Sequence, residues 1–146
     1  MGNTLLIGSC EPFSGKSALV LGLARHLLSE GRTVRFGKPL ATSLEWTAKG
    51  SPLPDPLIDD DVRFVGTTLG IDETRLIPSL HLLSPETADT RLRQGNLDAG
   101  TGLEMLLNDL QNDQDSFTML EAAGSLHEGL MYGLSLVQLA QGLDAP

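Results

Sequence analysis

An apolar run, a loop of small residues and an amphipathic helix follow one another at the start of this chain. Residues 3–7 are predicted to form a buried parallel strand, and residues 17–30 carry leucines at helical spacing. Gly31 follows the helix, where a C-terminal cap is expected. A second short strand is predicted over residues 33–36. Two strands joined through a helix form a parallel unit with a right-handed crossover, so we expect an α/β fold.

The loop between this first strand and helix contains Ser14, Gly15, Lys16 and Ser17. Backbone N–H groups at a helix start point at phosphate oxygens, where Lys16 would neutralise charge and Ser17 would bind Mg²⁺. The loop departs from the usual motif because Cys10 stands where its first glycine is expected. The loop predicts a P-loop NTPase-like domain that binds ATP and Mg²⁺. The alternative is an ordinary strand-to-helix turn with an exposed lysine.

The composition limits the classes of partner and compartment. A formal net charge of −9 argues against a general nucleic-acid binder. The sequence shows neither an apolar span long enough to cross a membrane nor a signal peptide, so no membrane association is expected. Cys10 is the only cysteine, which excludes an intramolecular disulfide and suits a reducing compartment. We therefore expect a cytoplasmic protein whose partner is a nucleotide.

The rest of the chain alternates between predicted helices and strands. The expected elements are an irregular loop over residues 38–56, a helix over 59–69 ended by Gly70, a strand or short helix over 76–83, a polar loop or helix start over 84–94, a helix over 97–110, a strand over 116–120 and part of a helix over 134–139. A doubly wound domain usually has more than three strands, so we expect a single incomplete domain, truncated at its C-terminus. Its unpaired sheet edge predicts self-association or marginal stability.

Several residues that could carry chemistry follow the predicted strands. Lys38 comes after the second strand and Glu121 ends the third, and parallel strands bring their carboxyl ends to one crevice. Because an unpaired buried carboxylate is costly, Glu121 is interpreted as functional. Lys38 is either a ligand contact or a solvated loop residue. The three aspartates at positions 59–61 either cap the following helix or supply Asp60 or Asp61 to a metal.

Aromatic residues are few, at 4% of the chain, so the core is expected to consist mostly of leucine, valine, isoleucine and alanine. Phe13 and Trp46 are interpreted as packing residues or loop anchors. Stacking against a ligand is the less favoured interpretation of both.

The order of these motifs resembles dethiobiotin synthetase. It is most similar to the dethiobiotin-synthetase-like domain at the N-terminus of some phosphate acetyltransferase-related proteins. The resemblance is carried by residues 11–17, 37–43, 60–64 and 120–124. The lysine-proline pair after the second strand, combined with the later Glu-Ala-Ala-Gly sequence, is its most discriminating part.

This resemblance implies a role for each candidate residue. The lysine and serine of the loop would hold ATP and the metal, as in the synthetase family. Lys38 would face the reacting end of a substrate and act as a catalytic residue. Mg²⁺ would be held by Ser17, by Asp60 or Asp61, and by Glu121.

The resemblance leaves three functions open. We expect an ATP- and Mg²⁺-binding module, nucleotide-binding or regulatory, of a phosphate acetyltransferase-related protein, partnered by a covalently attached C-terminal domain or by other copies of the chain. The first alternative is an ATP-dependent carboxylating ligase of the dethiobiotin synthetase type. Against it, Ala122 stands where that family has a glycine that lets substrate approach the backbone. The second alternative is an interaction protein that has lost nucleotide binding.

Overall fold

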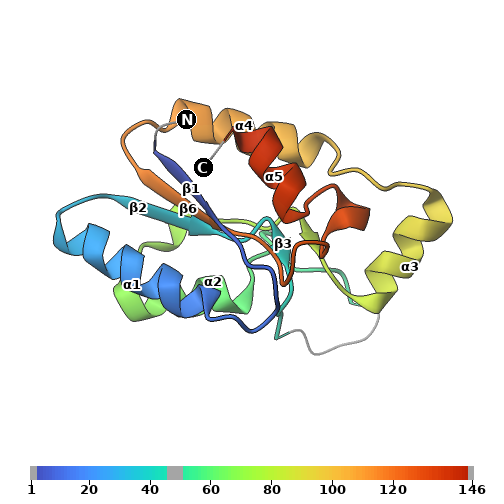
Figure 1. Ribbon diagram of the computed structural model, residues 1–146, viewed down its shortest axis with the longest axis horizontal. Coiled ribbons are helices and arrows are strands. Elements are labelled where there is room, and N and C mark those ends of the chain that lie inside the picture. The colour runs from blue at the N-terminus through green and yellow to red at the C-terminus, as the bar shows by residue number, and fades with distance from the viewer. Residues whose placement is uncertain (1–2, 46–50, 145–146) are drawn as a thin grey trace.

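A parallel sheet forms the centre of the molecule (Figure 1). The computed structural model describes residues 3–45 and 51–144. Within this part of the chain the main sheet has the strand order β1 (Thr4–Ile7), β6 (Phe117–Glu121), β2 (Val34–Gly37) and β4 (Leu76–Ile77). A second parallel pair joins β3 (Leu40–Ala41) to β5 (His81–Leu82). The expected α/β class, with a parallel sheet flanked by helices, is therefore confirmed.

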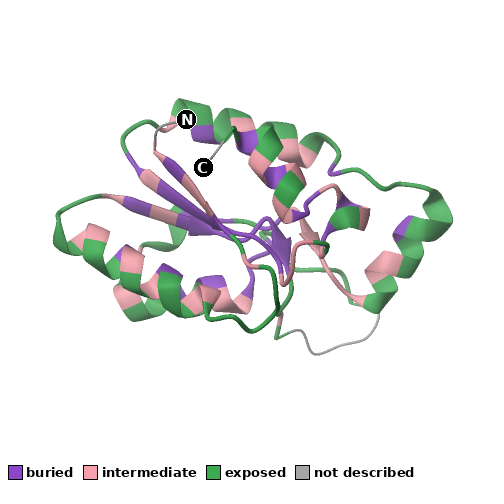
Figure 2. Cartoon of the chain, viewed as in Figure 1, coloured by how far each residue is buried: buried purple, intermediate pink, exposed green. Residues whose placement is uncertain are grey.

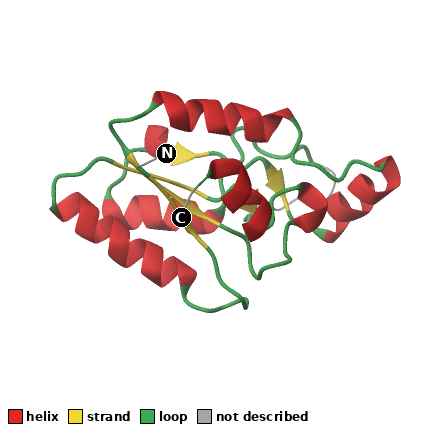
Figure 3. Ribbon diagram, turned by 45° about the horizontal axis from the view of Figure 1, so that its top comes forward, coloured by secondary structure: helices red, strands yellow, loops and turns green. Residues whose placement is uncertain are grey.

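Helices cover both faces of the main sheet (Figures 1 and 3). They are α1 (Lys16–Ser29), α2 (Asp60–Leu69), α3 (Pro85–Gln94), α4 (Thr101–Asn112) and α5 (Leu136–Leu143), with short 3₁₀ turns η1 (Glu73–Arg75) and η2 (Leu130–Tyr132). Helices α1 and α2 pack on one face, and α4 and α5 pack on the other. In the described residues, no helix combines the length and the apolar character needed to span a bilayer.

Strand β6 lies between β1 and β2, and its last four residues are buried between the helices on the two faces of the sheet (Figure 2). Successive strand residues point to opposite faces, so Met119 packs with the α1 and α2 side and Leu120 with the α4 and α5 side. β1 pairs only with β6 among the described residues and forms an edge of the sheet. Leu5 and Leu6 are therefore only partly buried, whereas the sequence predicted a buried strand.

Two of the strands are interrupted by proline and resume as the second sheet. Pro39 separates β2 from β3, and Pro78 separates β4 from β5. Proline has no N–H group to donate to a sheet ladder, so the main sheet ends at these positions. Across the break, Ser79 Oγ donates to the Lys38 carbonyl at 2.6 Å, and the Leu80 N–H donates to the Pro39 carbonyl at 2.8 Å. The interruption places Lys38 at the carboxyl end of β2.

The structure also corrects parts of the sequence interpretation. The helix expected over residues 97–110 begins only at Thr101, because Gly100 has a φ of +62° and serves as its N-cap. The polar segment 84–94 is a complete helix, α3, which Ser84 caps by accepting from the Thr87 N–H. The segment expected as an irregular loop contains β3. Trp46 lies outside the described residues.

Replacing Gly37 with alanine is expected to destabilise the fold. Gly37 lies opposite Ile77 in the β2–β4 pair, and a Cβ there would lie 2.5 Å from the Ile77 Cβ and 2.9 Å from its carbonyl oxygen. Such overpacking lowers the free energy of unfolding by about 1–3 kcal/mol, measurable by urea denaturation.

Gly22→Ala is the matched control, because Gly22 lies on the exposed side of α1 with nothing within 4 Å of its missing Cβ. In a helix this change should raise the free energy of unfolding by about 0.5–1 kcal/mol. Equal stability of the two variants would contradict the observed packing of β2 against β4.

Candidate functional site

A cleft opens where β1, β6 and β2 end. Its volume is about 810 Å³, and its lining includes both lysines and the glutamate selected from the sequence. Lys16 and Ser17 come from the start of α1, Lys38 follows β2, and Glu121 is the last residue of β6. Parallel strands bring their carboxyl ends to one edge of the sheet, which explains this convergence. The lining also includes Asp61, from the first turn of α2.

The first wall of the cleft is the loop that leads into α1. Gly15 has a φ of +86° and is the N-cap of the helix, a conformation that a residue with a Cβ rarely adopts. No side chain caps this helix end. The N–H groups of a first helical turn have no partners within the helix, and they carry the positive end of its dipole. This end of α1 is therefore suited to an anion.

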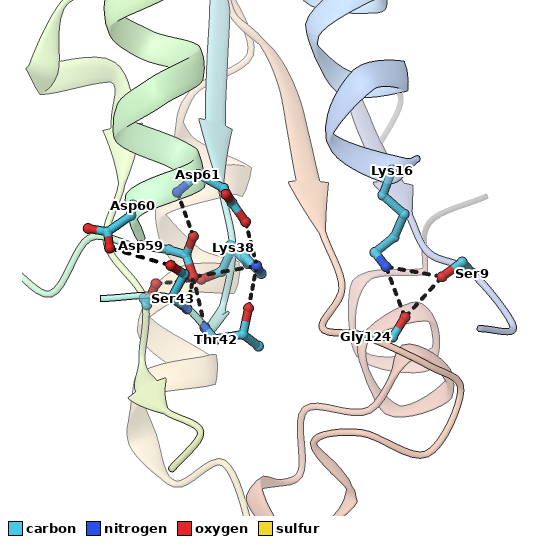
Figure 4. Close-up of polar contacts among 10 residues, drawn as sticks. Ser9, Lys16, Lys38, Thr42, Ser43, Asp59, Asp60, Asp61 and Gly124 are labelled. Carbon is cyan, nitrogen blue, oxygen red and sulfur yellow. Dashed lines mark hydrogen bonds and ion pairs between the residues drawn. The ribbon is translucent and has the colours of Figure 1, made fainter. Parts of the chain in front are cut away.

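Lys16 joins this loop to the segment that follows β6 (Figure 4). Its ammonium group donates to Ser9 Oγ at 3.0 Å and to the Gly124 carbonyl at 2.9 Å. Ser9 Oγ also lies 2.9 Å from that carbonyl and 2.6 Å from the Glu11 carbonyl. The structure therefore contradicts a simple exposed lysine in a strand-to-helix turn. All acceptors of this ammonium group are uncharged. The charged oxygens of a phosphate could therefore take their place as stronger hydrogen-bond acceptors.

The opposite wall is built around Lys38, whose side chain is only 4% exposed. Its ammonium group donates to Thr42 Oγ1 at 2.6 Å and to Asp61 Oδ2 at 3.3 Å, and it lies 3.4 Å from Asp59 Oδ2. The interpretation of Lys38 as a solvated loop residue is therefore wrong. Three acceptors surround its three N–H bonds, so the Lys38 side chain is fixed in position before any ligand binds (Figure 4).

The three consecutive aspartates have different roles. Asp59 is fully buried and is the N-cap of α2: it accepts from the N–H groups of Asp61, Thr42 and Ser43 at 2.8–3.0 Å. Asp60 accepts from Ser43 Oγ at 3.4 Å and does not line the cleft. Asp61 lines the cleft and pairs with Lys38. The capping interpretation therefore applies to Asp59, and Asp61 is the aspartate that meets the other candidate ligands.

The structure therefore brings three of the four predicted metal-binding residues, Ser17, Asp61 and Glu121, to one cleft. In residues 3–45 and 51–144, no group of three or more histidines, cysteines, aspartates or glutamates could hold a metal ion. Mg²⁺ commonly takes only one or two carboxylates and completes its shell with phosphate oxygens and water. The donor set in the cleft fits that mode and does not fit a metal site made of protein ligands alone.

Glu121 carries an unusual electrostatic cost. The residue is 3% exposed, and its Oε2 is the one buried side-chain polar atom of the described residues without a hydrogen-bond partner. Burial raises the pKa of this carboxyl group, the charges of Lys38 and Lys16 oppose the rise, and Asp61 and Asp59 add to it. A buried polar atom without a partner costs free energy and calls for an explanation. A ligand or cation in the cleft would provide one.

The sequence interpretation did not assign Phe13, Glu128 or Ser9 to the site. Phe13 lines the cleft but is fully exposed, so its interpretation as a packing residue is wrong. Glu128 also lines the cleft, with its carboxylate against Gly124. Ser9 follows β1 by two residues and binds Lys16. The position of Ser9 just after β1, which ends at this edge, is the signal that could have identified it, whereas Glu128 lies seven residues beyond the end of β6 and no such signal marks it.

Comparisons of the chain with known proteins give no independent assignment. No protein-family model matches it, and no curated protein is significantly similar to it. The residues of the cleft therefore carry the evidence about function.

Proposed function

We propose that the cleft binds ATP together with Mg²⁺, and that the chain is a P-loop NTPase-like module of the dethiobiotin-synthetase-like kind. The observation that carries this proposal is the buried Glu121 carboxylate, unpaired at Oε2, which lines the same cleft as Lys16 and Ser17. Phosphate-binding loops use an uncapped helix start with a lysine and a hydroxyl residue, and both features are present.

The phosphate chain would lie against the start of α1. Its oxygens would accept from the free N–H groups of the first turn, and Lys16 would exchange Ser9 and the Gly124 carbonyl for charged phosphate oxygens. Ser9 Oγ is already 2.9 Å from the Gly124 carbonyl and can donate to it after Lys16 has left. The exchange therefore leaves the part-buried Gly124 carbonyl with a donor, and the exposed Glu11 carbonyl can accept from water instead.

The Ser17 hydroxyl and the carboxylate of Glu121, which line the same cleft, would hold the metal. Mg²⁺ would neutralise charge on the phosphate oxygens when bound. A cation beside Glu121 would favour its ionised form and give Oε2 a partner. Asp61 lines the same cleft and could contribute a second carboxylate, directly or through water.

A second candidate is the ATP-dependent carboxylating ligase, which is favoured by the position of Lys38. This lysine lines the cleft opposite Lys16, where the resemblance implies the reacting end of a substrate. In that case ATP turnover should depend on diaminopelargonic acid and carbon dioxide. The regulatory module of a phosphate acetyltransferase-related protein should bind ATP without such turnover.

Calorimetric titration of the protein with ATP tests the proposal. We expect one binding site whose heat is present with Mg²⁺ and strongly reduced when the metal is chelated by EDTA. A phosphate-release assay with diaminopelargonic acid and bicarbonate then separates the ligase from the module. Absence of ATP binding in the presence of Mg²⁺ would remove both and favour an interaction protein without nucleotide binding.

A further inference from the structure

Phe13 has an unfavourable conformation and an unfavourable environment in the free protein. Its relative exposure is 103%, so the ring contacts essentially only solvent. Its φ of +56° is in the left-handed region, which a bulky residue rarely occupies. Both features cost free energy, and strain of this kind gathers at functional sites. A partner that covers the ring would offset the cost of its exposure.

The position of Phe13 indicates what that partner is. Phe13 lines the cleft together with Pro12 and with Gly15, Lys16 and Ser17. Pro12 and Phe13 are exposed residues of the cleft lining, next to the start of α1, whereas Lys38 and Glu121 in the same lining are buried. A cleft of about 810 Å³ has the size of sites that hold whole cofactors and drug-sized molecules. It therefore offers room for more of a ligand than its phosphate chain.

We propose that Phe13 is a specificity-determining residue that stacks on the base of the bound nucleotide. The inference rests on the proposed function and adds the part of the ligand that lies outside the phosphate site. Stacking on an aromatic ring uses the face of a base, which all bases share, and does not read its hydrogen-bonding edge. The contact therefore favours nucleotides over inorganic polyphosphates and discriminates weakly among bases.

The test compares Mg²⁺–ATP with Mg²⁺–tripolyphosphate, which has the same phosphate chain and no base. Phe13→Ala should weaken ATP binding about tenfold and leave tripolyphosphate binding unchanged. Phe13→Trp should retain ATP affinity because it keeps an aromatic face. Phe13→Leu should lose affinity almost as alanine does, which separates stacking from general apolar contact.

Phe64→Ala is the matched control, since Phe64 is 62% exposed on α2 and does not line the cleft. It should bind both ligands as the unchanged protein does. If Phe13→Ala weakens both ligands equally or neither, the stacking inference is overturned while the phosphate site stands. If the unchanged protein binds neither ligand, the proposed function fails as well. If Phe13→Ala abolishes self-association in sedimentation and leaves ATP affinity unchanged, the ring serves a contact between copies of the chain.

Discussion

Lys16→Ala is expected to weaken Mg²⁺–ATP binding by at least about 100-fold, beyond the range of calorimetry for a weak site. Lys16 is the one lysine or arginine of the loop over residues 8–17, and no other side chain of this loop can replace its charge. Its present acceptors are a hydroxyl and a carbonyl, so the exchange for phosphate oxygens gains charge-assisted hydrogen bonds. Folding should be little affected, because Ser9 Oγ remains within hydrogen-bond distance of the Gly124 carbonyl.

Arg25→Ala is the control for the loss of positive charge from α1. Arg25 is exposed on the same helix and does not line the cleft. Because salt screens exposed charges, Arg25→Ala should change the affinity for ATP very little. Similar effects of the two substitutions would show that ATP responds only to the overall charge, which contradicts a specific site at Lys16.

Glu121→Gln is expected to stabilise the free protein and to reduce the gain in ATP affinity that Mg²⁺ provides. The buried carboxyl has a raised pKa, which means that the folded state disfavours its charge, and glutamine resembles the uncharged form. The free energy of unfolding should rise by about 1 kcal/mol at mildly alkaline pH. The ratio of ATP affinities with and without Mg²⁺ should fall by at least about 10- to 100-fold, the typical cost of disturbing a metal shell.

The stabilisation depends on pH in a defined direction. Between the ordinary glutamate pKa of 4.5 and the higher pKa in the fold, the folded state binds more protons than the unfolded state. The free energy of unfolding of the unchanged protein, relative to Glu121→Gln, should therefore fall as pH rises through this window. The difference between the two proteins should stop changing with pH well below 4.5, where Glu121 is protonated in both the folded and the unfolded state.

Urea denaturation of both proteins across this pH range measures the effect, with exposed Glu104→Gln on α4 as the control. If the Glu121→Gln protein is less stable than the unchanged protein at every pH, the Glu121 carboxylate stabilises the fold. If the ATP affinity of the Glu121→Gln protein depends on Mg²⁺ as strongly as that of the unchanged protein, Glu121 does not bind the metal.

Much of the fold follows from local sequence patterns. The apolar residues of β1, β2 and β6 and the helical spacing in α1 and α4 are strong signals, because these elements bury one or both faces. Helix α3 has no such pattern: Leu92 is 57% exposed, and the helix is specified mainly by the cap at Ser84 and by Pro85. Strands β4 and β5 have two residues each, too few to show a period.

The candidate site was predictable where topology determines it. Lys16, Lys38 and Glu121 meet because parallel strands end at one edge of the sheet. The choice between Asp60 and Asp61 was not predictable, since neighbouring residues in a helix point about 100° apart and the entry angle of α2 depends on packing. The exposure of Phe13 depends on the path of a single loop, and no pattern of residues encodes it.

The most direct test of the central claim is an NMR titration of the unchanged protein with ATP, first with Mg²⁺ and then with paramagnetic Mn²⁺. Mg²⁺–ATP should shift the backbone amide signals of residues 15–17 and of residues 121–124 together. Mn²⁺ should broaden the signals of Ser17 and Glu121 most strongly. Shifts confined to other parts of the chain, or no shifts at saturating ATP, would contradict a nucleotide site in this cleft.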